Sequence, residues 1–315
     1  MATDVVTRPE ARGSGKYDEL LARCKGMAPV PTAVAHPCDE ASLGAALDAA
    51  RVGIITPILV GPADRIRAVA RAAGLDVTAY EIVDAPHSHA AAARAVELVR
   101  LGRAELLMKG SLHTDELMAE VVRREGGLRT DRRVSHVFVM DVPTYHKPLL
   151  ITDAAVNIAP TLEDKRDIVQ NAIDFAQALG ISRPKVAILS AVETVTTKIP
   201  STIDAAALCK MADRGQIRGG ILDGPLAFDN AISAEAARIK GIVSEVAGDP
   251  DILVVPDLEA GNMLAKNLTF LSRADAAGIV LGARVPIILT SRADNERARI
   301  ASCGVAALYA AARRR

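Results

Sequence analysis

Short apolar runs alternate with Ala-rich helical patterns along most of the chain. From about Tyr17 onward, "TAVAH" precedes "DEASLGAALDAARVG", and "TPILVG" precedes "PADRIRAVARAAG". Apolar runs bounded by turn residues predict buried strands, and apolar positions three or four apart predict helices. Strands that alternate with helices form a parallel sheet covered by helices on both faces. The pattern therefore predicts an α/β fold.

The rhythm changes near residue 141, where two strand-like runs follow one another without a helix. "RVSHVFVMDVP" and "KPLLITDAAV" are separated only by "TYH", which predicts an antiparallel excursion between sheets. The alternation then resumes with a helix in "TLEDKRDIVQNAIDFAQALG". In this helix Thr161 is the expected N-cap, Asp164 the capping-box partner and Gly180 the stop.

We therefore expect a mobile N-terminal tail at 1–16 and two doubly wound αβα domains. The first comprises 17–145 together with 285–315, because the last strand and helix can return to the first sheet. The second comprises 146–284. Ligands of open parallel sheets bind at the carboxyl ends of the strands, so we expect a cleft between the two domains.

Composition excludes several classes of protein. The chain has 315 residues, 38 basic and 38 acidic side chains, only 3% aromatic residues and no Trp, which argues against a nucleic-acid partner. No stretch approaches 18 continuous apolar residues, so we expect no membrane span, and the N-terminus lacks the pattern of a secretory signal. The four cysteines are far apart and form no metal-binding spacing. These features predict a cytoplasmic protein with reduced thiols.

The stretch "VPIILTSRAD" places polar residues directly after a buried strand. Thr290, Ser291, Arg292 and Asp294 precede a helical pattern, and a helix N-terminus attracts anions. A hydroxyl and a guanidinium fork there would complete a phosphate site. The alternative is structural, with Ser291 as an N-cap, Asp294 completing its capping box and Arg292 a solvated side chain.

Three other strand-to-helix turns carry candidate residues. In "VVPDLEAGNMLAKNL", Glu259 precedes Gly261 and Asn262, whose amides could touch a ligand or could belong to an ordinary cap and turn. In "ILDGPLAFDNAIS", Asp223 is the expected strand end, Gly224-Pro225 the turn and Asp229 the N-cap. In "LLMKGSLHT", Lys109 and Gly110 end a strand of the first domain.

Other fragments are better explained structurally. "GSGK" at 13–16 lacks the upstream glycine, the preceding strand and the following hydroxyl residue of a P-loop. His87 and His89 lack nearby metal-binding partners, and His113, His136 and His146 are scattered singly. Neither a G-x-S-x-G elbow nor an H-E-x-x-H motif occurs, so serine-hydrolase and zinc-peptidase functions lack support.

Read together, the phrases "SEVAG", "DLEAGN", "PIILTSRAD" and "YHKPLLITDAAVNIAP" resemble the phosphate acetyltransferase/phosphate butyryltransferase family, from about residue 100 to the C-terminus. The last two resemble the butyryltransferase branch more closely. The resemblance implies the reversible reaction of acyl-CoA and phosphate to acyl phosphate and CoA. It also implies a two-domain α/β fold similar to isocitrate and isopropylmalate dehydrogenases, and a homodimer or higher homo-oligomer. CoA and acyl-CoA would be substrates, with no permanently bound cofactor or metal.

By this resemblance, Ser291 and Arg292 line the phosphate and thioester site, and Asp294, or else Glu296, is the base toward the CoA thiol. The expected substrate-binding residues are Thr290, Gly261, Asn262, Glu259, Gly224, Pro225, Lys109 and Gly110. The reaction needs no protein nucleophile, so we expect direct transfer in a ternary complex. Two other functions stay open: a non-catalytic protein that binds acyl-CoA or acyl phosphate, and a metal- and NAD-dependent decarboxylating dehydrogenase on the same kind of fold.

Overall fold

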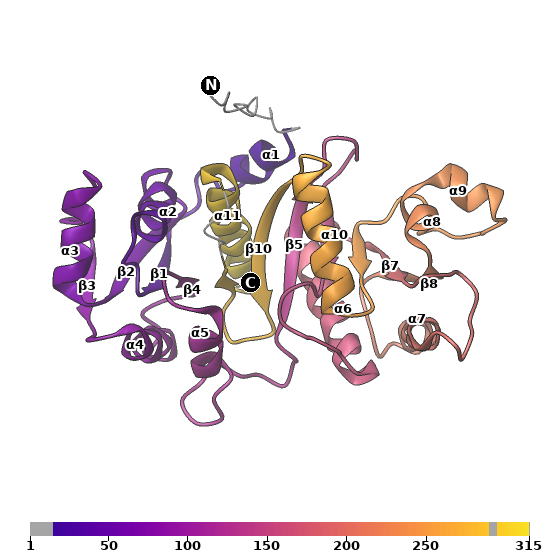
Figure 1. Ribbon diagram of the computed structural model, residues 1–315, viewed down its shortest axis with the longest axis horizontal. Coiled ribbons are helices and arrows are strands. Elements are labelled where there is room, and N and C mark those ends of the chain that lie inside the picture. The colour runs from indigo at the N-terminus through magenta and orange to yellow at the C-terminus, as the bar shows by residue number, and fades with distance from the viewer. Residues whose placement is uncertain (1–14, 290–294, 315) are drawn as a thin grey trace, which may run out of the picture.

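A computed structural model describes residues 15–289 and 295–314 (Figure 1). These residues form an 11-stranded sheet with the strand order β3-β2-β1-β4-β11-β10-β5-β6-β9-β7-β8. The predicted α/β fold is confirmed at this level. The sheet runs without a break through both predicted domains, and the division between them stays a prediction.

The first part of the sheet is a parallel block, and its strands other than the edge strand β3 are rich in buried Val, Ile, Leu and Ala. Such strands are nearly continuous apolar runs because both of their faces are covered. The last of them pairs with β4, so the predicted return of the final strand to the first sheet is confirmed. The block comprises β1 (Val30–Ala35), β2 (Ile55–Gly61), β3 (Glu81–Asp84), β4 (Leu106–Lys109) and β11 (Ile287–Ile288).

Two long antiparallel strands join this block to the second one. β5 (Ser135–Asp141) pairs antiparallel with both β10 (Asp275–Leu281) and β6 (Leu149–Thr152), so the predicted antiparallel excursion is confirmed. β10 comes from the predicted second domain but lies between β11 and β5 of the first. The second parallel block consists of β6, β9 (Ile252–Val254), β7 (Lys185–Leu189) and β8 (Ile221–Leu226).

The pairing directions have a consequence for the site. β11 is antiparallel to β10, β10 to β5, and β5 to β6. Three reversals separate the blocks, so the strands of the first block point to one edge of the sheet and those of the second block to the opposite edge.

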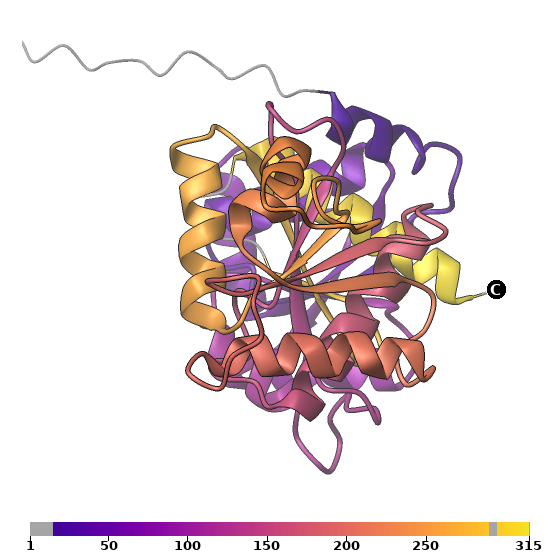
Figure 2. The ribbon, with the colours of Figure 1, turned by 90° about the vertical axis from the view of Figure 1, so that its right-hand side faces the viewer.

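Helices cover both faces of the sheet, as the end-on view of Figure 2 shows. On one face a single apolar core runs beneath α1 (Lys16–Ala22), α2 (Glu40–Arg51), α3 (Ala63–Ala72), α6 (Leu162–Ala178), α7 (Pro200–Asp213) and α11 (Glu296–Arg313). The other face carries two cores. One lies under α4 (Ser88–Arg100) and α5 (Thr114–Val121). The other lies under α8 (Phe228–Ile232) and α10 (Leu258–Phe270), with α9 (Ala234–Ile239) packed on α8.

Local signals place several helix ends. The Thr161 hydroxyl accepts from the Asp164 amide, and the Asp164 carboxylate accepts in return, so the predicted capping box is confirmed. The predicted tail at 1–16 extends too far, however. Residues 1–14 lie outside the described part, but Lys16 begins α1, and its buried ammonium lies 3.0 Å from the Asp141 carboxylate. Lys16 of the "GSGK" fragment is therefore part of the core of the fold.

Candidate functional site at the strand ends

The carboxyl ends of β1 and β4 are held close together by Gly110. Its amide donates to the Ala35 carbonyl at 2.9 Å, and a Cβ at this position would lie 2.4 Å from that oxygen and 2.5 Å from the His36 carbonyl oxygen. Only glycine permits this approach without movement of the backbone. Lys109 ends β4, and its ammonium donates to the Gly110 carbonyl at 3.2 Å.

The end of β11 lies beside these residues. Ile288 pairs with Met108 in parallel register, so Leu289 follows next to Lys109. Thr290, Ser291, Arg292 and Asp294 themselves lie outside the described residues.

The start of α11 excludes one interpretation of this segment. Asn295 is the N-cap of the helix, and its side chain accepts from the Ala298 amide at 2.8 Å. The same side chain donates to Asp275 at 3.0 Å, which fixes the cap to the first residue of β10. Ser291 was the alternative candidate for this cap, and that interpretation is wrong. Glu296, the reserve choice for the base, is the first residue of α11 and is exposed.

At the opposite edge, the N-terminus of α10 packs against the loop that follows β6. Asp257 caps the helix by accepting from the Ala260 amide at 2.9 Å, and the Gly261 amide donates to the Asp257 carbonyl. The predicted cap and turn is confirmed, and the Gly261 amide is used within the helix. A Cβ on Gly261 would lie 2.9 Å from Ala154 Cβ. The absence of a side chain at Gly261 therefore lets α10 pack closely against the loop after β6.

The neighbours of Gly261 differ in their surroundings. Asn262 directs its amide nitrogen toward the Ala154 carbonyl at 3.4 Å, which links α10 to the same loop. Glu259 is exposed in the first turn of the helix.

Two predictions around Gly224 and Pro225 are wrong. β8 does not end at Asp223 but continues to Leu226, with an irregularity in its register with β7 between the Ala187 and Leu189 positions. β8 is the edge strand, where a proline that lacks an N–H is tolerated. A Cβ on Gly224 would lie 2.7 Å from Ile188 Cβ, so the glycine serves packing between strands. Ala227, not Asp229, is the N-cap of α8.

The predicted residues thus gather in two places rather than one. Lys109 and Gly110 lie with the end of β11, whereas Gly261, Asn262 and Glu259 lie at the opposite edge. Gly224 and Pro225 are on the outermost strand of the second block. We expected the loops after the strands to meet at one edge of the sheet, which is true only if all strands are parallel. The three reversals of direction place the loops of the two blocks at opposite edges instead.

A buried polar centre lies directly after β6, in the loop that contacts α10, and sequence reasoning missed it. Asp153, directly after β6, accepts from the amides of Ala155 and Val156 at 2.9 and 3.0 Å and from the Asn157 side chain at 2.6 Å. The Asp153 carboxylate also accepts from the His136 amide at 3.1 Å. These bonds shape the loop between β6 and α6, against which α10 packs. The sequence pattern that could have indicated this centre was the polar stretch "TDAAVN" after an apolar strand.

His136 is part of this centre. Its ring lies 4.3 Å from the Phe138 ring, centroid to centroid, and a Cβ on Gly278 would lie 2.9 Å from its Nε2. Burial lowers the pKa of His136 to about 4, although the nearby Asp153 carboxylate opposes the shift. His136 is therefore neutral at physiological pH, in agreement with the structural role predicted for it.

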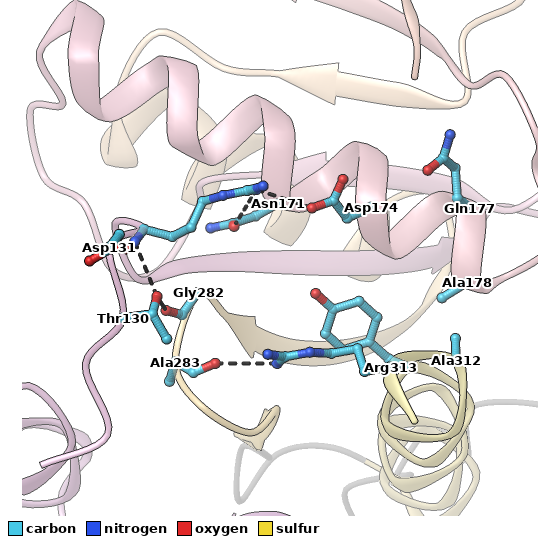
Figure 3. A pocket seen from close by; sticks show the side chains of 12 residues that line it. Thr130, Asp131, Asn171, Asp174, Gln177, Ala178, Gly282, Ala283, Ala312 and Arg313 are labelled. Atoms are coloured by element: carbon cyan, nitrogen blue, oxygen red, sulfur yellow. Dashed lines mark hydrogen bonds and ion pairs between the residues drawn. The ribbon is translucent and has the colours of Figure 1, made fainter. Parts of the chain in front are cut away.

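A cavity of about 630 Å³ lies elsewhere, between α6 and the end of α11 (Figure 3). An ion pair between Arg132 and Asp174 at 3.0 Å and the stacked side chains of Arg313 and Tyr309 form part of its wall. None of the predicted site residues that the structure describes lines this cavity, so we do not place the reaction there.

Two further properties concern the described residues only. In the ranges 15–289 and 295–314, no group of three or more His, Cys, Asp or Glu side chains could hold a metal ion. No helix in these ranges is long and apolar enough to cross a membrane.

Comparisons with known proteins identify the family. Residues 87–307 match the family described as Phosphate acetyl/butaryl transferase. The chain is 72% identical to a phosphate acetyltransferase of Rhizobium meliloti over 95% of both chains. It is 44% identical to a phosphate butyryltransferase of Clostridium acetobutylicum, covering 93% of this chain and 98% of the relative. A branched-chain phosphotransacylase structure from Enterococcus faecalis V583 superposes with a TM-score of 0.78 at 32% identity, covering 89% of this chain and 99% of that one.

Phosphate acetyltransferases and phosphate butyryltransferases are both among the relatives, so the predicted likeness to the butyryltransferase branch stays a prediction. The family itself is confirmed: the chain belongs to the phosphate acetyltransferase/phosphate butyryltransferase family.

Proposed function

We propose that this protein is a phosphate acyltransferase that interconverts acyl-CoA plus phosphate and acyl phosphate plus CoA, with acetyl as the preferred acyl group. The observation that carries the proposal is the 72% identity to a phosphate acetyltransferase over 95% of both chains. CoA and acyl-CoA are substrates, and phosphate and acyl phosphate are the other partners. The protein acts in the cytoplasm.

The chemistry uses the segment after β11. In the direction of acyl-CoA synthesis the CoA thiol attacks the carbonyl carbon of the acyl phosphate, and phosphate leaves with the C–O bonding electrons. A free thiol with a pKa near 8.5 is only a few per cent ionised at pH 7, so a carboxylate that accepts its proton speeds the attack by about 10²–10⁴-fold. Asp294 is our choice for this base, with Glu296 in reserve. Arg292 and Ser291 stabilise the charge that builds on the carbonyl oxygen and the departing phosphate.

The substrates lie in a cleft on the face of the sheet between α5 and α10, in an architecture similar to isocitrate and isopropylmalate dehydrogenases. Three observations support this placement. The Leu289 carbonyl lies beside Gly278, where a Cβ would be only 3.1 Å from it. Val156 packs against the core under α4 and α5, and Ala154 of the same loop contacts α10. The loop after β6 therefore spans from α10 to the first block on this face.

The protein acts as a homodimer or higher homo-oligomer. Support comes from α10 and the residue that follows it, where the large apolar side chains of Met263, Phe270 and Leu271 are 65%, 59% and 77% exposed. Met263 and Phe270 are seven positions apart and share one face of the helix. Phe270→Asp should shift the mass measured by light scattering toward the monomer. An unchanged mass would contradict this surface.

One experiment tests the activity. CoA release from acetyl-, propionyl- and butyryl-CoA is measured with and without phosphate. We expect release that depends on phosphate and is fastest with acetyl-CoA. Release without phosphate would indicate a hydrolase, and tight binding of acyl-CoA without turnover would indicate a non-catalytic binding protein.

Variants test the residues. Arg292→Ala should lower turnover by roughly 10²–10³-fold and weaken phosphate binding, since one lost donor of this kind has that effect. Arg284→Ala removes an exposed arginine outside the segment and serves as the matched control. Asp294→Asn should lower kcat far more than it changes KM. Unchanged phosphorolysis in Arg292→Ala would refute the assignment of the segment.

A further inference from the structure

The cavity shown in Figure 3 lies between the two predicted domains, on the face of the sheet opposite the proposed cleft. Its walls come from α6 of the second predicted domain and from the end of α11, which belongs to the first. Both helices pack on the core that also runs beneath α2 and α7, whereas α5 and α10 cover the other face. A volume of about 630 Å³ is in the range of cavities that hold small molecules. α11 has 18 residues, so this end of the helix is about 27 Å from its start beside the segment 290–294.

Tyr309 of α11 brings an unpaired hydroxyl to this cavity. The residue lines the cavity but is only 8% exposed, and its ring packs edge to face against the Phe175 ring, with 5.6 Å between the centroids. Among residues 15–289 and 295–314, the hydroxyl has no hydrogen-bond partner. Burial raises the pKa of Tyr309 above its ordinary value, so the hydroxyl keeps its proton at neutral pH and is available as a donor. A buried tyrosine hydroxyl usually has a partner, so this one indicates a ligand.

Arg313 places a positive charge beside this tyrosine. Its guanidinium carbon lies 5.7 Å from the centre of the Tyr309 ring, and one N–H donates to a backbone carbonyl of the turn after β10 at 3.3 Å. A guanidinium has five N–H donors, and Arg313 forms no ion pair with a carboxylate of the described residues, so most of its donors stay available.

The two carboxylates of the cavity wall do not neutralise Arg313. Asp174 is paired with Arg132 at 3.0 Å. Asp131 lies at one end of the cavity, and its side chain is turned away from Arg313 (Figure 3). Tyr309 and Arg313 together therefore offer hydrogen bonds and positive charge to a carboxylate or phosphate group.

A second cavity, of about 700 Å³, adjoins the first and shares residues 131 and 132 with it. Its wall is rich in arginine. Arg166 is neutralised by Asp167 at 2.9 Å, but Arg214 and Arg218 form no ion pair within the described part of the chain. Two hydrogen bonds of 2.8 and 3.0 Å hold the Arg218 backbone to the Gln170 side chain of α6, so the loop before β8 is fixed beside the cavity. The two cavities together suit a ligand with two anionic groups.

We propose that the two cavities form an effector site for a small organic molecule that carries two anionic groups, each a carboxylate or a phosphate. One group accepts hydrogen bonds from the Tyr309 hydroxyl and Arg313, and the other binds at Arg214 and Arg218. This site rests on the proposed function, because its ligand regulates the transferase. The ligand joins α6 to α11 and so restricts movement between the two predicted domains. Turnover commonly depends on such movements, so the bound ligand lowers kcat without competing with the substrates.

Binding is tested by titration calorimetry with succinate, a dicarboxylate, and with fructose 1,6-bisphosphate, at constant ionic strength. We expect at least one of them to bind to the unmodified protein, and the one that binds identifies the class of the anionic groups. Tyr309→Phe, which removes only the hydroxyl, and Arg313→Gln should each weaken this binding about 10-fold, the effect of one hydrogen bond to a charged group.

The matched controls are Tyr80→Phe and Arg71→Gln, which change a partly exposed tyrosine before β3 and an exposed arginine of α3. Both should bind the anion as the unmodified protein does. Absence of binding by both compounds, or equal affinity in the unmodified protein and either cavity variant, would overturn the site.

Turnover tests the regulatory role. CoA release from acetyl-CoA and phosphate is measured with increasing concentrations of the anion that binds. We expect kcat to fall while the KM values for acetyl-CoA and phosphate stay unchanged. Without the anion, Tyr309→Phe should have the kcat of the unmodified protein, and it should lose the inhibition at the same anion concentration. A constant kcat, or a raised KM for phosphate that indicates competition at the reaction site, would refute the effector role.

Calorimetry needs no turnover, so failure of this site and failure of the transferase function can be told apart. Equal affinity in the unmodified protein and the cavity variants sinks the effector site and leaves the function intact. Failure of the unmodified protein to exchange phosphate for CoA would sink the function instead, while binding of the anion could still be measured.

Discussion

His136 makes the free energy of unfolding depend on pH in the mildly acidic range. The folded protein keeps the ring neutral down to a pKa of about 4, whereas the unfolded chain takes up a proton near the ordinary value of 6.5. Between these values the unfolded state binds more protons, so stability falls as the pH falls. One pKa unit corresponds to about 1.4 kcal/mol, so the full loss is roughly 3 kcal/mol. Below pH 4 this group contributes no further loss.

Chemical unfolding at several pH values between 7 and 4 measures the effect. His136→Phe replaces the ring with one of similar shape that cannot be protonated, beside Phe138 and Gly278. The variant's stability at pH 7 can shift in either direction, but its slope between pH 6.5 and 4 should lack the contribution of His136. If His136→Phe and the unmodified protein lose the same stability over this range, His136 is not the group responsible.

Two further changes probe the ends of the sheet. Gly110→Ala should cost roughly 1–3 kcal/mol of stability and reduce activity, because the new Cβ would lie 2.4 Å from the Ala35 carbonyl oxygen. The control is Gly44→Ala, which should be neutral or stabilising because a Cβ at that position meets nothing within 4 Å. Thermal melts and turnover compare the two, and equal effects would refute the close-approach argument. Burial opposes the shift at Asp249, but Lys185 and Lys147 hold its pKa at about 2. Its depressed pKa means that stability is lost as the pH falls from about 3.8 to 2, so Asp249→Asn should flatten acid unfolding in that window relative to the unmodified protein, and an unaltered acid profile would contradict this.

Much of the fold was predictable because its signals are local. The capping box of Thr161 and Asp164, the antiparallel pair β5–β6 and the return of the last strand all follow from short patterns of apolar and polar residues. The turn at Gly224-Pro225 was mispredicted because these two residues are determined by a neighbouring strand and not by local signals. A glycine and a proline in sequence predict a turn, but here neighbouring Ile188 requires the glycine, and the edge position tolerates the proline.

The site was harder to predict because it depends on contacts between distant segments. Gly261 looked like a ligand-binding glycine because it begins a helix after a strand. A Cβ at this position would meet Val255 at 2.7 Å and also Ala154, more than a hundred residues earlier, at 2.9 Å, and the contact with Ala154 cannot be read from the local sequence.

The direction of the strands explains why the polar loops did not meet at one edge. In a purely parallel sheet, every loop after a strand would face the same crevice. Here β10 and β5 reverse the chain in the middle, so loops of the two blocks can share a ligand only across a face of the sheet. Such sharing requires little side-chain bulk in the middle of the sheet, and Gly278 in β10, with the Leu289 carbonyl beside it, meets this requirement. A side chain at Gly278 would press on both Leu289 and His136. Gly278, which carries no functional group, therefore determines how closely Leu289 and His136 approach the middle of β10.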